Sequence, residues 1–539
     1  VAQTVTTRSV LDIEGNVLEV VDGRDNTAEG RTYGMLGQPL RTTSEDAGER
    51  RMVSDVLGQP LRLFDDRGQT FRFEYDALRR TTHAWMQPSV GSEQLLVRNA
   101  YGELAASPEA SNLRGRLLRQ YDGAGLVDHV AFDFAGNELN TTRTMHVTAT
   151  ATPDWVALAT ETTLAGLDTE ASTLLDTETF STTATYDALG RPVTQTTHDG
   201  SITRYAYNAA GLLESVEVDI RGATPSTTIV SDIDYDVHGR RLSVAHGNGT
   251  TTAYMFDPVT FRLARIRTTR DTGGDVVQDL RYFYDPVGNV VEIQDDATQT
   301  EYFANTVVEP HQQFAYDALY RIISAAGREH VSQGQPTSSE LTPGSHPEAS
   351  DPAAMRRYTE TYAYDAVSNL LTHQHVATGG SWTRHYVYAT AGNRLLKTSA
   401  PGDPGAGPYS LEYEYDAHGN MTAMPHIAAI DWDPLDRMQH ADLGGGGDVY
   451  FQYDAAGNRV RKIRVNTAGT QTEERIYLGA LELYRERTSG VLQLKRETLH
   501  VSDDTARVCM IETRTVSGGS PVSSPANDAR YQYGNHLGT

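Results

Sequence analysis

The chain has 539 residues, a formal net charge of −25 and an isoelectric point near 5.0. This charge argues against a nucleic-acid binder, because phosphate neutralisation requires basic patches and none is visible. Only 38% of the residues are hydrophobic, which is low for compact globular cores and fits an all-β protein with a large hydrated area. The acidic surface fits either a solvated exterior or a wall that holds a basic polypeptide.

A short phrase recurs along the chain: an aromatic residue, an Asp, two variable residues, often a Gly, and then Asn or Arg. The Asp-equivalent positions 187, 208, 236, 257 and 285 follow one another at intervals of 21 or 28 residues. Such a spacing is typical of a repeat array, in which one small supersecondary unit is copied many times. The copies are Tyr75-Asp76, Tyr121-Asp122, Tyr186-Asp187, Tyr235-Asp236, Tyr284-Asp285, Tyr316-Asp317, Tyr364-Asp365, Tyr415-Asp416 and Tyr453-Asp454.

Each copy predicts a β-hairpin. A second large apolar residue stands two positions before the aromatic one, as in Tyr205 and Tyr207, and this matches the two-residue period of a strand. The Asp carboxylate can accept hydrogen bonds from turn amides, and a Gly such as Gly190 follows where the backbone needs a positive φ. A lone hairpin is marginal in water. We therefore predict an all-β array of antiparallel hairpins, laid side by side so that neighbours bury an aromatic ladder.

Three segments interrupt the array. Residues 84–115 and 150–180 carry leucines and alanines in mixed surroundings, so we expect a short helix in the first and a helical or loop insertion in the second. Residues 333–356 are rich in Pro, Ser, Gly and Glu and are expected to form an exposed loop. None has the size of a separate domain, so we expect residues 1–539 to form a single repeat structure.

Several side chains that often carry chemistry have simpler explanations here. His373 and His375 lie two apart on a predicted strand and point to one face, but without further ligands nearby we favour surface histidines over a metal site. The acidic pairs Asp503-Asp504 and Glu473-Glu474 are expected to be solvated charge. Cys509 lies in an alternating stretch and is expected to be a small buried hydrophobic residue. As the single cysteine, it excludes an intramolecular disulfide.

The sequence contains no GxSxG elbow, HExxH motif, Walker loop or EF-hand loop, so we predict no enzymatic activity, no cofactor and no metal site. No apolar run approaches the length of a membrane helix, so we predict no membrane insertion by this chain. No signal peptide is visible. The sequence starts at Val1 rather than Met, and we expect it to be part of a longer protein.

The repeat phrase, the block from Glu309 to Arg321, the following Gly327–His330 and the ending Tyr531–Gly538 resemble RHS/YD-repeat proteins. Within that group, the 309–330 block and the Asn112–Arg116 segment are most similar to the B and C subunits of insecticidal toxin complexes, the Tc toxins. The N-terminal gate region of a B subunit and the C-terminal self-cleavage and toxin regions of the family are not recognisable in this chain.

The resemblance implies a β-sheet ribbon that spirals into a hollow shell. Such shells enclose a C-terminal toxin polypeptide and shield it until delivery, and we expect this chain to do so without enzymatic activity. For this chain it implies a toxin polypeptide as cargo, further shell polypeptide or a translocation pore subunit as a partner, and secretion as a bacterial toxin component. The resemblance also suggests that His536 holds the last turn of the spiral.

An extracellular adhesion or glycan-binding YD-repeat module is the alternative, since aromatic ladders on sheets also bind sugars. The sheet face that lines the interior stays open at this point, because both orientations satisfy the same two-residue period.

Overall fold

The computed structural model describes residues 4–333 and 351–538, so most of the predicted loop at 333–356 lies outside the described residues. Nearly all regular structure in the described part is antiparallel β-strand, and most strands pair with the strands before and after them in the sequence. The predicted all-β array of hairpins is confirmed.

The main sheet has 29 strands. In chain order they are β1 (Arg8–Leu11), β2 (Val17–Val21), β3 (Thr27–Tyr33), β4 (Pro39–Ser44), β5 (Gly48–Ser54), β6 (Pro60–Asp65), β7 (Thr70–Tyr75), β8 (Thr81–Gln87), β9 (Gln94–Tyr101), β10 (Leu117–Asp122), β11 (Gly125–Phe132), β12 (Glu138–His146), β13 (Leu175–Tyr186), β14 (Pro192–Thr196), β15 (Ile202–Tyr207), β16 (Leu213–Asp219), β17 (Thr227–Tyr235), β18 (Arg241–His246), β19 (Thr250–Phe256), β20 (Leu263–Arg270), β21 (Val276–Tyr284), β22 (Val290–Asp295), β25 (His311–Tyr316), β26 (Ile322–His330), β27 (Met355–Tyr364), β28 (Leu370–Ala377), β29 (Trp382–Tyr388), β30 (Leu395–Thr398) and β31 (Leu411–Glu412).

The remaining strands form two short pairs and a sheet of ten strands. The pairs are β23 (Glu301–Phe303) with β24 (Thr306–Val308), and β32 (Glu414–Tyr415) with β33 (Met421–Ala423). The sheet consists of β34 (Ala429–Trp432), β35 (Met438–Asp442), β36 (Asp448–Tyr453), β37 (Arg459–Val465), β38 (Gln471–Leu478), β39 (Leu481–Thr488), β40 (Val491–Ser502), β41 (Arg507–Ser517), β42 (Ser520–Pro521) and β43 (Asn527–Tyr531). The described helices are α1 (Leu164–Ala171) and the 3-10 turns η1 (Gly102–Leu104), η2 (Pro108–Ser111), η3 (Val156–Leu158), η4 (Ile220–Gly222) and η6 (Gly444–Gly446).

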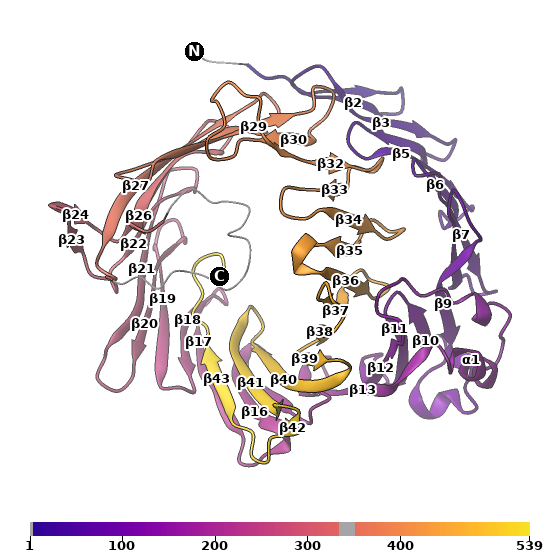
Figure 1. The fold of residues 1–539 in the computed structure, drawn as a ribbon. Helices are drawn as coiled ribbons and strands as arrows, with labels where there is room; N and C mark the ends of the chain where they lie inside the picture. The colour runs from indigo at the N-terminus through magenta and orange to yellow at the C-terminus, as the bar shows by residue number, and fades with distance from the viewer. Residues whose placement is uncertain (1–3, 334–350, 539) are drawn as a thin grey trace.

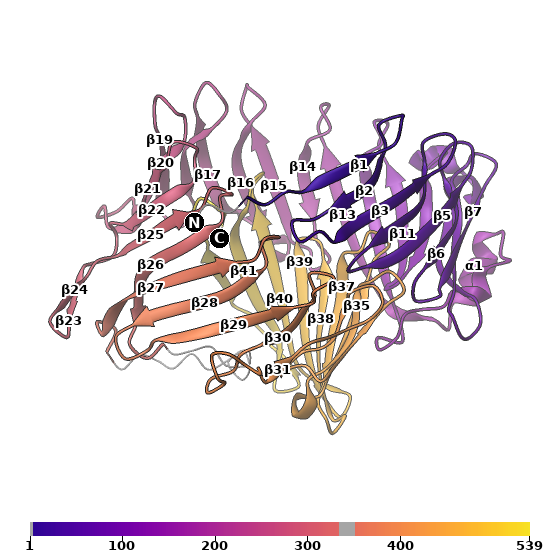
Figure 2. The same cartoon turned by 90° about the horizontal axis from the view of Figure 1, so that it is seen from above.

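Curvature of the sheet brings distant parts of the chain together. In Figure 1 the strands from β2 to β29 follow a closed path round the molecule, and the strands from β32 to β41 continue inside it. Figure 2 shows the same ribbon from above, with β40 and β41 beside β15 and β16. We call β1 to β26 the first coil and β27 to β43 the second coil. The expected spiral is therefore confirmed.

The recurring phrase builds one turn geometry. At Asp187, Oδ1 accepts from the amides of Leu189 (2.9 Å) and Arg191 (3.0 Å), and Oδ2 accepts from the Arg191 guanidinium (2.7 Å). Gly190 has a φ of +77°, where a Cβ would be strained. Where Asn replaces Arg, as at Asn458, its side-chain amide donates to the Asp (3.0 Å). Both carboxylate oxygens are thus used to close the turn, which explains the choice of Asp.

The tyrosine of the phrase joins each repeat to the one before it. Tyr207 donates to the Pro192 carbonyl (2.9 Å) and Tyr453 to the Met438 carbonyl (2.8 Å), each at the start of the preceding return strand. Arg191 also lies over the Tyr207 ring, 4.2 Å from its centroid. The same tyrosine bond is made by Tyr75, Tyr235, Tyr284, Tyr316, Tyr364 and Tyr415.

The second coil packs face to face on the first. One apolar cluster joins β16–β18 to β40 and β41, with Val216 and Ile229 on the first coil and Leu499, Cys509 and Ile511 on the second. Cys509 is fully buried, as expected, and burial raises the pKa of its thiol to about 11. A second cluster joins β11–β13 to β37–β39. The ribbon is therefore two sheets thick along this part of its path.

Residues 84–87 and 94–101 of the interruption at 84–115 are regular strand, so the expected short helix is wrong at Leu95 and Leu96, whereas Leu104 ends the 3-10 turn η1. Leu95 lies in β9 and is fully buried with Trp155, while its neighbour Leu96 packs on the other face with Phe71 and Met86. Because both faces of β9 are covered, its apolar run lacks the alternation that identifies most strands. The remainder of this segment is loop, with η1 and η2 as its helical turns.

Between 150 and 180 the chain leaves the sheet for η3 and α1 and returns at β13. Thr163 caps α1 by accepting from the Gly166 amide (3.1 Å). Leu167 of α1 is fully buried with Trp155, which packs against the Tyr121 ring at 5.2 Å. The insertion thus covers β9 to β11.

Candidate functional site

The two coils meet along a row of turns that we call the seam. The second coil contributes its Asp-containing repeat turns, whereas the first coil contributes turns from the opposite edge of its sheet. These are 22–26, 44–48, 65–69 and 122–125 on the first coil, against 365–369, 389–394, 416–420, 433–437 and 454–458 on the second. A repeat turn therefore closes its own hairpin and also supports the neighbouring coil.

Many seam bonds end on backbone carbonyls. Arg24 donates to the Ala389 carbonyl (3.4 Å) and to the Asn393 side chain (3.0 Å). Arg67 donates to the Asp433 carbonyl (3.2 Å). Since a carbonyl is present whatever the side chain, this kind of contact can recur from turn to turn although the sequences of the turns differ.

Asp122 corrects the sequence prediction. The sequence predicts a repeat turn at Tyr121-Asp122, but Asp122 lies at the turn between β10 and β11, at the opposite edge of the sheet. The side chain is fully buried and receives two bonds from Arg143 (2.8 and 2.9 Å), one from the Ala124 amide (2.9 Å) and one from the Ala455 amide of the second coil (3.2 Å). Asp122 is therefore a charged anchor of the seam.

The repeat turn of this region is instead formed by Phe132 and Asp133, which the sequence analysis missed. Asp133 accepts from the Gly136 amide (2.7 Å) and the Asn137 amide (2.8 Å), and its other oxygen binds the Asn137 side chain (2.8 Å). Phe replaces Tyr here, but the Gly136-Asn137 pair three residues after Asp133 is the signal that identifies the turn.

A charge network crosses the seam at His418. Its Nδ1 lies 2.8 Å from Asp436, and its Nε2 lies 3.6 Å from Asp65 of the first coil. Arg67 (2.8 Å) and Arg50 (2.6 Å), also of the first coil, bind Asp436. Burial acts to raise the pKa of Asp436, but the hydrogen bonds from His418 and its neighbours outweigh burial and hold the pKa below its ordinary value.

Glu474 is buried rather than solvated as expected, with an exposed fraction of 3%. Glu473 and Glu474 point to opposite faces of β38, and only Glu473 meets solvent. Arg461 binds Glu474 at 2.5 Å, and Arg485 lies between Glu474 (3.7 Å) and Glu178 of the first coil (2.5 Å). Burial acts to raise the pKa of Glu474, but the guanidinium groups outweigh it and lower that pKa.

Asp503 is likewise buried, with 1% of its side chain exposed, so the solvated charge expected here is wrong for this residue. It binds Arg241 of the first coil at 2.6 Å, and Asp504 binds the same guanidinium. Arg221 of the first coil pairs with Glu497 in the same way. Ion pairs thus join the coils in addition to the apolar clusters.

Of the two histidines on β28, His373 is half-buried and His375 is buried, so the surface position expected for the pair is wrong for His375. His375 is 4% exposed, stacks on the Trp382 ring at 5.2 Å, and lies 3.1 Å from both Glu329 and Glu360. His373 lies 3.3 Å from Glu360. Within residues 4–333 and 351–538, no group of three or more His, Cys, Asp or Glu side chains is arranged to hold a metal ion.

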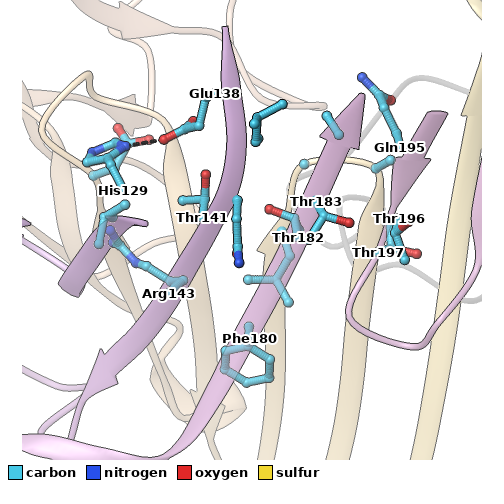
Figure 3. A pocket seen from close by; sticks show the side chains of 18 of the residues that line it. His129, Glu138, Thr141, Arg143, Phe180, Thr182, Thr183, Gln195, Thr196 and Thr197 are labelled. Carbon is cyan, nitrogen blue, oxygen red and sulfur yellow. Dashed lines mark hydrogen bonds and ion pairs between the residues drawn. The ribbon is translucent and has the colours of Figure 1, made fainter. Parts of the chain in front are cut away.

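A cavity of about 490 Å³ opens beside the seam, between β10–β15 of the first coil and the turns at 454–460 and 477–480 of the second. Figure 3 shows His129 paired with Glu138 at one end, Phe180 at the other, and threonines of three strands between them. Arg143, the partner of Asp122, also lines it. Among the described lining residues, none forms a nucleophile and base pair.

In the described part of the chain, no turn from the opposite edge of the sheet is bonded to the repeat turns of the first coil, in contrast to those of the second, and we call this edge the free rim. Apolar side chains stand at the tips of its turns, with Ile13 and Met35 fully exposed and Val237 96% exposed. Others on the free rim are Val56, Leu78, Phe134, Leu189 and Val259.

The end of the second coil is fastened to the first. His536 packs on the Tyr282 ring at 4.8 Å, and its amide donates to the Tyr282 hydroxyl (3.2 Å). Tyr533 binds the side chains of Asn248 (2.8 Å) and Thr250 (2.9 Å). The closing segment therefore lies against β18–β21. No helix in the described ranges is long and apolar enough to cross a membrane.

An antiparallel β-ribbon that coils on itself and is bonded turn to turn defines a shell-like β-sheet protein built from repeats. The RHS Repeat family model matches residues 186–224, and the chain as a whole is similar to Tc toxin subunits.

Toxin subunits YenC1 and YenC2 of Yersinia entomophaga are 29% and 27% identical to it over 94% and 99% of this chain. The chain spans about half the length of these curated relatives, 51% and 57%. A solved structure of TcdB2-TccC3 matches with a TM-score of 0.86 and 28% identity, over 99% of this chain and 26% of that chain. A Photorhabdus luminescens Tc holotoxin pore matches with the same TM-score and identity over 99% of this chain and 25% of that chain.

Proposed function

We propose that this chain is part of a non-enzymatic shell that encloses a toxin polypeptide and shields it until delivery. The seam carries this proposal, because it bonds successive coils of the ribbon into a wall at turns more than 300 residues apart in sequence. The similarity to YenC1, YenC2 and TcdB2-TccC3 supports the same function. Such a wall acts by exclusion and needs no reactive group.

The free rim supports a second polypeptide as a partner. In this chain the repeat turns of the second coil are covered by opposite-edge turns of the first, so the exposed repeat turns of the first coil offer the same kind of surface to another coil. Exposed side chains at the tips of these turns, such as Ile13, Met35 and Val237, would be removed from water when another coil docks on them. We infer that this partner is further shell polypeptide, that the cargo is a toxin polypeptide, and that the assembly is secreted from a bacterium.

The glycan-binding alternative receives less support from the structure. Sugar binding by an aromatic ladder requires open ring faces, whereas the repeat tyrosines are half-buried and their hydroxyls donate to carbonyls of the neighbouring repeat, as in Tyr207 and Tyr453. Arginines such as Arg191 and Arg437 also lie over these two rings.

Small-angle X-ray scattering tests the proposal on the purified chain. A compact chain of this length has a radius of gyration of roughly 24 Å. We expect a clearly larger radius and a pair-distance distribution skewed towards long distances, because a wall places its mass away from its centre. A radius near the compact value with a symmetric distribution would refute a shell. Ile13→Glu combined with Met35→Glu should leave this scattering unchanged while weakening co-purification with further shell polypeptide.

A further inference from the structure

A concave patch lies on the face of the second coil that points away from the first. Phe451, Lys462, Arg475 and Tyr484 are direct cross-strand partners in succession along β36–β39. They alternate along their strands with residues such as Ile476, which packs on the first coil. The patch borders a cavity of about 680 Å³, within the usual range for ligand sites.

The charge of this patch is opposite to that of the chain. Lys462 faces Arg475 directly across the strand pair, and like charges in this position destabilise a sheet. Arg475 is bound by Glu482, and Arg464 lies 3.4 Å from Glu473. Among the residues that the structure describes, no carboxylate lies within 4 Å of the Lys462 ammonium, and the more distant attraction of Glu473 is outweighed by burial and the nearby guanidinium groups. A half-buried cation that lacks a close ion-pair partner and lies beside two arginines costs stability.

Apolar side chains form the floor beneath these cations. Val449, Phe451, Leu443 and Tyr484 line the same cavity. Burial, reinforced by the nearby guanidinium groups, lowers the pKa of Lys462. A bound anion would relieve the repulsion between Lys462 and the nearby arginines, and an apolar group beside that anion would cover the apolar side chains that line the cavity.

We propose that this patch binds an extended polypeptide segment with an acidic residue next to an apolar one, its carboxylate on Lys462 and its apolar side chain on Phe451. Strands about 4.8 Å apart make the four-strand patch roughly 15 Å wide, which fits about four extended residues. The site is independent of the shell function, because it depends only on the local chemistry of β36–β39.

Lysine labelling offers a direct test, because the chain has only three lysines, at 397, 462 and 495. Lys397 pairs with Glu412, and Lys495 pairs with Glu497 at 2.8 Å, so both serve as internal controls. The probe is a five-residue peptide of alternating Leu and Glu with blocked ends, compared with the same peptide carrying Gln in place of Glu. The folded chain is acetylated with and without peptide, and each lysine is quantified by mass spectrometry.

The Glu peptide should protect Lys462 and leave Lys397 and Lys495 unchanged, whereas the Gln peptide should protect none of them. Equal acetylation of Lys462 with and without the Glu peptide, or equal protection by both peptides, overturns the proposal. In fluorescence anisotropy, Lys462→Met should weaken Glu-peptide binding roughly tenfold, as expected for a lost charge-assisted bond. Lys397→Met should not change it. Unchanged binding by Lys462→Met, or equal loss in both variants, overturns the site, while scattering by the chain reports separately on the shell.

Discussion

Replacing Asp122 with Asn removes a negative charge from the buried part of the seam while keeping the shape of the side chain. The carboxylate binds Arg143 through both oxygens, at 2.8 and 2.9 Å, and only 9% of the Arg143 side chain is exposed. The variant therefore leaves a buried guanidinium without a counter-charge.

The cost follows from this uncompensated charge. Removing one partner of a buried ion pair costs about 3–5 kcal/mol. The bond from the Ala455 amide of the second coil is also weakened, and a single bond of this kind contributes about 1 kcal/mol. Asp76→Asn is the matched control, because Asp76 makes the same kind of pair with Arg80 but in a partly exposed turn. A pair at such a site contributes about 1 kcal/mol or less.

Urea denaturation measures both losses, and hydrogen exchange at Ala455 reports on the seam itself. We expect Asp122→Asn to lose several-fold more stability than Asp76→Asn and to speed exchange at Ala455. Equal losses in the two variants, or unchanged exchange at Ala455 in Asp122→Asn, would refute the conclusion that Asp122 anchors one coil to the other.

Tyr453→Ala should cost a few kcal/mol through lost aromatic packing, whereas Glu473→Ala should change little; equal midpoints in thermal melts would show that the ladder is not buried. Tyr320 has a φ of +63° and Gly457 a φ of +87°, a backbone region that favours glycine over residues with a Cβ. In urea denaturation, Tyr320→Gly should therefore stabilise the chain by about 0.5–1 kcal/mol, and Gly457→Ala should destabilise it by about 1 kcal/mol. Glu474 has a lowered pKa in the folded chain, so its contribution is complete above the ordinary Glu pKa of about 4.3 and is lost as the pH falls through the lowered value. The stability advantage of the native chain over Glu474→Gln, followed by urea denaturation against pH, should be large at pH 7 and shrink in acid; a constant advantage would contradict this.

The hairpins could be predicted because their chemistry is local. The turn at Asp187 is built from groups within four residues of the carboxylate, so the order of residues is enough to identify it. Asp122 shows the limit of this reasoning. Its sequence context matches that of Asp187, yet its role depends on which edge of the sheet it occupies and on Ala455, which is far away in sequence.

Burial of charge could not be predicted for the same reason. Glu473 and Glu474 are adjacent in sequence, but whether each meets solvent depends on the face that the second coil turns towards the first. The basic patch at Lys462 could not be predicted from the sequence for a different reason. Its cations come from alternate positions on neighbouring strands, so no basic run appears in an acidic chain, and only strand register brings Lys462 and Arg475 together.

The apolar clusters and the seam bonds contribute differently to the association of the two coils. Apolar clusters such as Val216 with Leu499 supply a large favourable term on burial, but this term depends on area and not on direction. A sheet that slid over its neighbour would keep much of it. The seam bonds of Arg24, Arg67 and Asp122 are directional, and each is lost when a turn moves by a few ångströms. The apolar faces therefore hold the coils together, while the seam fixes their register, so that a ribbon stabilised mainly by nearest-neighbour pairing acquires one defined curvature.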